Sequence, residues 1–296
     1  MSRIYEALKR SGDSRPSQIS RSIDSIQTEV EQGEERNGVV TRLAPSRGHE
    51  EALEPHYDMH SRSSNYPLVT LQLPLPAPVF PFNGGSPQAS EQYRVLRTNL
   101  LQHPAQPRVM AVSSASPGDG KSTTTVNLAG TFALKTDANV LIIDADLRRC
   151  GVADALRLDT TLGLTDVLRG QCALEEAIVR VDQMPNLHVL PSRRSPKNPA
   201  ELLDSPAWKT MIGALREQFS YILIDTTPVQ AVADFKLVQQ VCDGVVIVVR
   251  PDHTNRQALT RAMEIEKNGK LLGLVVNAYE DWFLWDTSRS YGYYTS

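Results

Sequence analysis

Cysteine frameworks and long apolar runs are both missing from this chain of 296 residues. Its three cysteines, Cys150, Cys172 and Cys242, are far apart and form no Cys-x-x-Cys pair. Neither a disulfide scaffold nor a zinc knuckle is therefore indicated, and a reducing cytoplasm fits best. No apolar stretch approaches the roughly 20 residues that span a bilayer, and the N-terminus has no apolar signal core, so we expect neither membrane insertion nor export.

A strong excess of one charge is also missing, since 31 Lys and Arg oppose 34 Asp and Glu for a formal net charge of -3. The net charge of the chain thus gives no overall electrostatic attraction to nucleic acid, and we do not expect nucleic acid as a partner. An apolar content of 41% suffices for one substantial α/β core with extensions, or for two small domains.

The first part of the chain, residues 1–85, is rich in Ser, Arg, Glu, Gln and Pro. Its Pro-rich end, 73–78, favours extended polyproline geometry, so we interpret this part as a largely disordered arm. At its start, Ser2 can cap a short helix over residues 2–10, either frayed in solvent or a docking peptide for a partner. We expect a folded domain at 86–280 and a flexible tail at 281–296.

Short β-branched runs alternate with helical segments from residue 89 onward. This pattern predicts an α/β fold in which helices cover both faces of a mostly parallel sheet. The expected strands are Arg108–Ser114, Val140–Asp144, Leu187–Leu190, Tyr221–Asp225, Val245–Arg250 and Leu271–Val276. The expected helices are Ser90–Leu101, Lys121–Lys135, Leu164–Arg169, Pro206–Phe219, Ala231–Val241 and Arg256–Lys267.

A Walker A motif lies between the first of these strands and the helix that follows it, the context that makes such a match credible. Its glycines let backbone N–H groups turn toward phosphate oxygens at a helix N-terminus. Lys121 is expected to reach the β- and γ-phosphates of ATP, and Ser122 to offer its hydroxyl to Mg²⁺, whereas Ala115 replaces the first glycine of the strict pattern. The nucleotide-binding residues are predicted to be Ser116, Gly118, Asp119, Gly120, Lys121, Ser122 and Thr123.

Acidic residues follow two further buried strands at the sheet edge where α/β proteins bind ligands. Asp144 and Asp146 follow one strand, and Asp225 follows another. We expect Asp225 to hold the magnesium shell, while Asp144 or Asp146 accepts a proton from an attacking hydroxyl. Taken singly, each acid is also compatible with an ordinary turn or helix cap.

Three tyrosines, Tyr291, Tyr293 and Tyr294, lie in the last six residues of the chain. Since no apolar period surrounds them, they are not core residues of a regular element. A flexible tail reaches an active site easily, although it can equally be a surface tail or a strand added to a neighbour.

Together these segments resemble the bacterial tyrosine kinases of capsule and exopolysaccharide production, in the group whose kinase is separate from its membrane activator. The resemblance runs from residue 86 to the C-terminus, with a further match at residues 4–9. It includes a Glu-x-x-Arg-x-x-Arg element, Glu91, Arg94 and Arg97, and the segments 163–168 and 198–203. The family usually has Asp-Thr-Pro-Pro where this chain has Asp-Thr-Thr-Pro at 225–228, which leaves the acid intact.

The resemblance implies a cytoplasmic P-loop kinase that uses ATP and Mg²⁺ and phosphorylates its own C-terminal tyrosines. It assigns Asp144 and Asp146 to catalysis and Mg²⁺, with Asp225 in Walker B, and it assigns Glu91, Arg94 and Arg97 to ring assembly between subunits. The partners implied are a membrane-anchored polysaccharide co-polymerase that activates the kinase, a cognate tyrosine phosphatase and other copies of the chain. The kinase would then lie at the inner membrane through its partner.

Two alternatives remain. A partitioning or cell-division positioning ATPase of the same wider fold would be a switch without a protein substrate, but such proteins carry an early P-loop lysine where this chain has Ser116. A catalytically weak scaffold of a polysaccharide export complex is the other. All the catalytic residue types are present, which favours the kinase.

Overall fold

The structure is a computed structural model that describes residues 66–73, 87–135, 137–193, 195–229 and 233–278. These residues fall within one compact unit, His56–Ser296. The helix expected at residues 2–10 and the tail at 281–296 lie outside the described residues. The division of the chain at residue 280 therefore stays a prediction.

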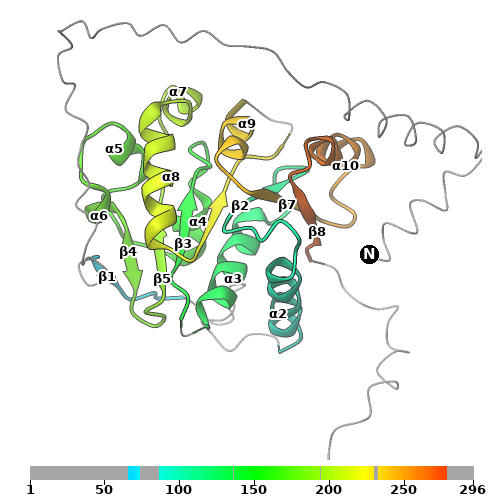
Figure 1. Ribbon diagram of the computed structural model, residues 1–296, viewed down its shortest axis with the longest axis horizontal. Coiled ribbons are helices and arrows are strands. Elements are labelled where there is room, and N and C mark those ends of the chain that lie inside the picture. Colours follow the sequence, from blue (N-terminus) through cyan, green and yellow to red (C-terminus); the bar gives the residue numbers. More distant parts are fainter. Residues whose placement is uncertain (1–65, 74–86, 136, 194, 230–232, 279–296) are drawn as a thin grey trace, which may run out of the picture. The chain divides into compact units, whose positions relative to one another are not determined.

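The described residues contain one eight-stranded sheet with the strand order β1-β4-β5-β3-β6-β2-β7-β8 (Figure 1). The strands are β1 (Leu68–Val69), β2 (Val109–Ser114), β3 (Val140–Asp144), β4 (Val179–Val181), β5 (Leu187–Leu190), β6 (Tyr221–Asp225), β7 (Gly244–Val249) and β8 (Leu271–Val276). The six strands from β5 to β8 in this order are mutually parallel, whereas β4 is antiparallel to β5. The predicted mostly parallel sheet is confirmed.

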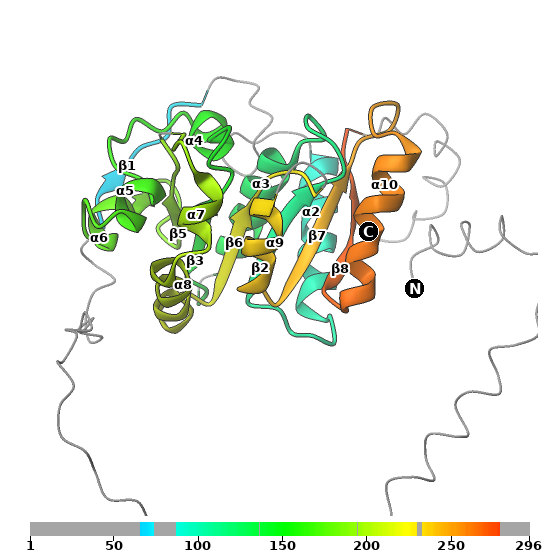
Figure 2. The ribbon, with the colours of Figure 1, turned by 90° about the horizontal axis from the view of Figure 1, so that it is seen from above.

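Helices cover both faces of the sheet (Figure 2). They are α2 (Pro87–Leu101), α3 (Lys121–Ala133), α4 (Gly151–Leu156), α5 (Leu164–Leu168), α6 (Leu174–Ala177), α7 (Pro199–Leu203), α8 (Pro206–Gln218), α9 (Ala233–Gln240), α10 (Arg256–Ala262) and the 3-10 helix η1 (Met263–Asn268). Because successive side chains of a strand point to opposite faces, Leu141 and Ile143 of β3 join the core beneath α8 and α9, whereas Val140 and Ile142 join the core beneath α3 and α4.

The elements that the sequence did not predict are all short. None of β1, β4, α4, α6 and α7 exceeds six residues, and so short a segment indicates its own secondary structure only weakly. The helix predicted at Arg256–Lys267 is α-helical only to Ala262 and continues as η1.

Residues 66–73 correct the boundary placed at residue 85, because they pack in the sheet rather than in an arm. Tyr66 and Leu71 are buried in the two cores, and β1 pairs in parallel with β4. The side chain of Gln183 fixes the segment through two hydrogen bonds, since its Oε1 accepts the N–H of Leu71 at 3.1 Å and its Nε2 donates to the Leu71 carbonyl at 2.9 Å.

Candidate nucleotide site

The loop between β2 and α3 turns through two glycines with positive φ, Gly118 at 89° and Gly120 at 93°. Residues with a Cβ rarely adopt this conformation, so the loop requires glycine at both places. A Cβ on Gly120 would also lie 2.0 Å from Nδ2 of Asn277, which follows β8. The same amide donates to the carbonyl of Asp119 at 2.9 Å and so ties the loop to the end of β8.

The side chain of Asp119 shapes this loop from within the protein. Its Oδ2 accepts the N–H of Ser116 at 2.7 Å, and its Oδ1 lies 2.9 Å from Nδ1 of His253 and accepts the Thr254 hydroxyl at 2.8 Å. The carboxylate is fully buried. Ser116 and Asp119 thus hold the loop in shape and are not among the residues that line the cavity beside it.

That cavity has a volume of about 430 Å³ and lies at the start of α3. Its lining combines P-loop residues with residues that follow β3 and β6: Pro117, Gly118, Gly120, Lys121, Ser122, Thr123, Asp146, Arg148, Arg149, Gly151, Thr227 and Pro228. A second cavity of about 760 Å³ is lined by residues of α2 and of the end of β8, and shares Gly118, Gly120 and Thr123 with the first.

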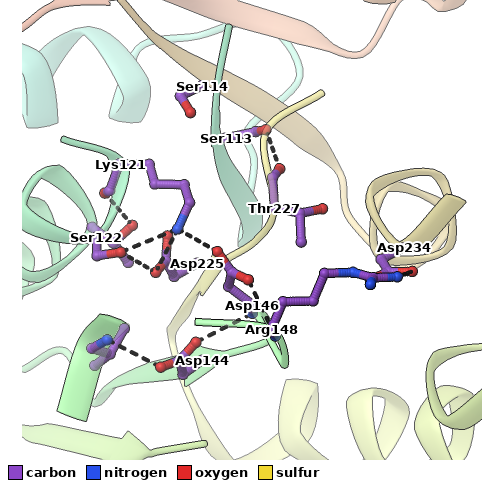
Figure 3. A network of polar contacts seen from close by, with 12 residues as sticks. Ser113, Ser114, Lys121, Ser122, Asp144, Asp146, Arg148, Asp225, Thr227 and Asp234 are labelled. Atoms are coloured by element: carbon purple, nitrogen blue, oxygen red, sulfur yellow. Dashed lines mark hydrogen bonds and ion pairs between the residues drawn. The ribbon is translucent and has the colours of Figure 1, made fainter. Parts of the chain in front are cut away.

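The structure brings the predicted catalytic lysine together with two of the three predicted acids (Figure 3). Nζ of Lys121 lies 2.7 Å from Oδ2 of Asp146 and 3.6 Å from Oδ2 of Asp225. The hydroxyl of Ser122 donates to the same Asp225 oxygen at 2.5 Å. Parallel pairing explains the convergence, because β3 and β6 are neighbours and place Asp144 directly opposite Asp225.

Asp144 is held differently from the other two acids. Its Oδ2 accepts the N–H of Val152 at 3.0 Å, and its Oδ1 accepts the N–H of Asp146 at 3.2 Å. Asp144 therefore fixes the turn that runs from β3 into α4, and it is not among the residues that line the cavity.

Burial of these acids changes their protonation. Desolvation, together with the charge of Asp225, holds the pKa of Asp144 well above its usual range. Desolvation raises the pKa of Asp225 to about 6, although Lys121 and the Ser122 hydroxyl act in the opposite direction. Burial works against the charge of Lys121, but Asp225 and Asp146 outweigh it, so the pKa of the ammonium is raised.

The donor set around Asp225 fits Mg²⁺. Its Oδ1 is fully buried and makes no hydrogen bond within the described part of the chain, whereas its Oδ2 accepts the Ser122 hydroxyl, so the carboxylate has an unused lone pair for an ion. Across residues 66–278, gaps aside, no three His, Cys, Asp or Glu are grouped to hold an ion by themselves. Mg²⁺ suits such a site, because it binds through one or two carboxylates with nucleotide phosphates and water.

Several residues at this site were not predicted from the sequence, among them Arg148, Thr227 and Asp234. Arg148 forms an ion pair with Asp234 of α9, and Thr227 lines the cavity. Arg148 follows Asp146 by two residues, which was the one signal available. Asp234 lay within a predicted helix, and nothing local connects it to position 148.

The three residues predicted to mediate ring assembly do not share one environment in the structure. Glu91 and Arg94 are exposed on α2 and pair with each other at 3.1 Å. Arg97 instead turns toward α3, where its Nη1 donates to the carbonyl of Thr131 at 2.9 Å. The two exposed residues are available to another subunit, whereas Arg97 joins two helices of its own chain.

The parallel sheet, the glycine loop and the strand-end acids define a P-loop NTPase-like protein. The protein family described as an AAA domain matches residues 107–270. The tyrosine-protein kinase YwqD of Bacillus subtilis (strain 168) is 38% identical over 209 residues, which cover 69% of this chain and 86% of the relative. The tyrosine-protein kinase CpsD of Streptococcus agalactiae is 34% identical over 193 residues, 64% of this chain and 83% of the relative.

Two solved structures and one longer relative are also similar to this chain. The chimerical protein CapA2B2 superposes with a TM-score of 0.62 at 28% identity, over 70% of this chain and 91% of that one. The kinase domain of the Escherichia coli tyrosine kinase ETK gives 0.58 at 25% identity, over 65% and 78%. The tyrosine-protein kinase ptk of Acinetobacter johnsonii is 34% identical over 68% of this chain but only 28% of its own length.

The chain belongs to the family of bacterial tyrosine-protein kinases. This confirms the family and the class of enzyme predicted from the sequence. Within the described residues, no helix has both the length and the apolar character needed to cross a membrane.

Proposed function

We propose that the chain is an ATP-dependent protein-tyrosine autokinase that phosphorylates its own tail at Tyr291, Tyr293 and Tyr294. The observation that carries the proposal is the contact of Lys121 and Ser122 with Asp146 and Asp225 at one end of the P-loop cavity. Phosphoryl transfer needs little covalent chemistry from the protein, and positioned charge of both signs is what it does need.

The two cavities support a simple placement of ATP. Its phosphates would occupy the smaller cavity, where Gly118 and Gly120 present backbone N–H groups and Lys121 supplies positive charge. Its nucleoside would extend into the larger cavity, whose walls include Val95 of α2 and Val276 of β8. The loop shared by both cavities would lie beneath the phosphate chain.

Mg²⁺ would be held by the Ser122 hydroxyl and by Asp225. When bound, it supplies positive charge that offsets the charge developing on the phosphoryl oxygens. Because Ser122 already donates to Asp225, the site needs no large movement to present both oxygens to an ion. Asp144, which the sequence also assigned to the metal, supports this arrangement by shaping the turn behind it.

Asp146 is the best supported acceptor for the proton of the tyrosine hydroxyl, because it alone of the three acids lines the cavity. Its Oδ2 is occupied by Lys121 before nucleotide binds. When Lys121 moves to the phosphates, this oxygen becomes free to accept the proton. The oxygen–phosphorus bond to ADP breaks as the bond to the tyrosine oxygen forms.

We further propose the cellular context that the family suggests: regulation of exopolysaccharide or capsule polymerisation and export by a cytoplasmic kinase that reaches the inner membrane through a membrane-anchored activator. Similar kinase sequences occur within a longer chain, as in ptk, of which this chain covers 28%, and in a shorter one, as in YwqD, of which it covers 86%. Assembly into a homo-oligomeric ring and reset by a tyrosine phosphatase belong to the same proposal.

The distribution of transferred phosphate tests the proposal. The chain is incubated with MgATP, with and without the cytoplasmic tail of a candidate activator, and phosphotyrosine and inorganic phosphate are counted per ADP released. An autokinase yields phosphotyrosine that depends on Lys121. Release of ADP with inorganic phosphate alone would favour the switch ATPase, and absence of ADP release would favour the scaffold.

A further inference from the structure

Besides Lys121, Arg148 lines the P-loop cavity. Figure 3 shows its side chain extending away from Lys121 toward Asp234 of α9. The guanidinium of Arg148 is bound by Asp234 through two hydrogen bonds, from Nε at 2.8 Å and from Nη2 at 3.4 Å. Asp234 is only 1% exposed, in the first turn of α9, whereas Arg148 is 45% exposed. A buried carboxylate thus fixes one edge of a planar cation whose other edge is open.

The open edge carries Nη1, which makes no hydrogen bond within the described residues. Arg148 lines the same cavity as Lys121, so this edge is accessible to a ligand of the site. A guanidinium in this position suits an anion with several equivalent oxygens, and a phosphoryl group is the anion expected there.

The hydroxyl of Thr227 is a second, independent indication that this cavity binds a ligand. Thr227 lines the cavity and is 2% exposed, and its hydroxyl finds no hydrogen-bond partner in the described part of the protein. Its backbone is fixed, because the Ser113 hydroxyl donates to the Thr227 carbonyl at 2.7 Å. A buried hydroxyl without a partner is unfavourable, so a ligand that accepts its hydrogen bond would offset that cost.

Asp234 also keeps Arg148 away from the acids of the site. Three carboxylates, Asp144, Asp146 and Asp225, lie at the strand ends, and two of them, Asp146 and Asp225, already hold Lys121. An untethered guanidinium beside them would be drawn to the same charges and would compete with Lys121 and Mg²⁺. The tether therefore preserves the open edge for a ligand.

We propose that Arg148 and Thr227 form a subsite for the transferring phosphoryl group in the cavity that Lys121 also lines, and that Asp234 is the positioning residue that orients Arg148. This inference rests on the proposed function and deepens it, since the subsite would act on the same phosphoryl group. Donors fixed before the reaction stabilise charge that develops during transfer more than they stabilise bound nucleotide.

Binding of a phosphoryl mimic tests the subsite without requiring turnover. Isothermal titration compares MgADP alone with MgADP plus aluminium fluoride, which mimics the phosphoryl group in transfer. We expect Arg148→Gln to weaken the fluoroaluminate complex about 100-fold and Thr227→Val about 10-fold, while MgADP alone changes less than about threefold. We expect about a 10-fold loss for Asp234→Asn, and Arg148→Lys should recover only part of the loss, because a lysine cannot make the paired contacts.

A matched control comes from a second pair of arginine and aspartate, Arg216 and Asp243. Arg216 and Asp243 form the same kind of double contact, at 2.8 and 3.2 Å, and Asp243 accepts the N–H groups of Arg108 and Val109 at the start of β2. Asp243→Asn should lower the melting temperature. It should leave unchanged the increase in MgADP affinity that aluminium fluoride produces. Asp234→Asn should reduce that increase in affinity. It should also raise the Mg²⁺ concentration at which ADP binding is half-maximal.

The outcomes separate this inference from the proposed function. Equal losses for MgADP and for the fluoroaluminate complex, or no loss in the Arg148 and Thr227 variants, would overturn the subsite even if the tail is phosphorylated. A selective loss in the fluoroaluminate complex would support the subsite even if ADP release proved to occur by hydrolysis. If the subsite exists, the same variants should also lower kcat and leave the KM for ATP nearly unchanged.

Discussion

Nζ of Lys121 lies 2.7 Å from Oδ2 of Asp146, so the lysine that is expected to bind phosphate is paired with a carboxylate of its own chain. The pair is almost fully shielded from solvent, with side-chain exposures of 10% and 1%. Phosphate must therefore replace Asp146 as the partner of Lys121. Nucleotide binding and release of the proposed proton acceptor are in this way the same event.

Asp146→Asn should strengthen the binding of nucleotide without Mg²⁺, because it frees Lys121 and removes one charge that repels phosphate. We expect the affinity for Mg²⁺-free ADP to rise by about 10-fold, and transfer to the tail to fall by about 100-fold or more as the proton acceptor is lost. Titration calorimetry and initial rates measure the two effects. Weaker binding of ADP by the variant would show that Asp146 does not hold Lys121 away from phosphate.

Asp225 should make stability depend on pH in a defined direction. Its pKa is about 6 in the folded protein against an ordinary 3.8, so the folded state holds the proton more tightly than the unfolded chain. The free energy of unfolding should therefore fall as pH rises from about 4 to about 6. Asp225→Asn should remove this loss and stabilise the nucleotide-free protein by on the order of 1 kcal/mol at neutral pH.

Thermal unfolding across that pH range checks the Asp225 prediction. The difference between variant and wild type should be largest at neutral pH and should vanish at the acid end, where Asp225 is protonated in both states. The same variant should lose activity that depends on Mg²⁺. A difference that stays constant across the range would contradict the raised pKa.

Gly151 should be needed for the Ser122 hydroxyl to reach Mg²⁺. A Cβ at position 151 would lie 2.6 Å from Oγ of Ser122, so Gly151→Ala should displace the hydroxyl from Asp225. We expect MgADP affinity to fall by about 10-fold, a cost typical of one lost hydrogen bond to a charged group. Titration of MgADP measures this change.

Gly213 provides the control for Gly151, because it lies inside α8 and a Cβ there would meet nothing within 4 Å. Gly213→Ala should leave MgADP affinity unchanged and stabilise the fold by about 0.5 to 1 kcal/mol, since alanine favours the helix. Equal affinity in both variants would mean that Gly151 has no particular role at the metal site.

Substitution of Arg94 should affect assembly and substitution of Arg97 should affect stability, although both belong to one sequence element. Arg94→Ala should reduce assembly measured by light scattering and leave the melting temperature nearly unchanged, because its pair with Glu91 is exposed. Arg97→Ala should destabilise the protein by about 1 kcal/mol, because it removes a hydrogen bond between α2 and α3. Identical masses for wild type and Arg94→Ala would argue against assembly through this helix.

The central strands could be predicted from the sequence because strands buried on both faces form continuous apolar runs. Those expected at Val140–Asp144 and Tyr221–Asp225 have these bounds in the structure, and the neighbouring order of β3 and β6 accounts for the meeting of their acids. The P-loop could be predicted for a similar reason, since its glycines, lysine and serine are contiguous in the chain.

The contacts that complete the site could not be predicted, because they join polar residues far apart in the sequence. Arg148 and Asp234 are separated by 86 positions, and Asp119 and Thr254 by 135. Neither pair has a period or a spacing that marks it. The edge segment at residues 66–73 was missed because two paired residues and one buried tyrosine are too few to distinguish a strand from a polar arm.

The central claim is that this site transfers phosphate to tyrosines of the tail, and phosphopeptide mass spectrometry after incubation with MgATP and activator tests it most directly. The wild type should carry phosphate on Tyr291, Tyr293 or Tyr294, whereas Lys121→Met and the triple tyrosine-to-phenylalanine variant should carry none there. An unmodified tail in a wild-type protein that consumes ATP would contradict the account.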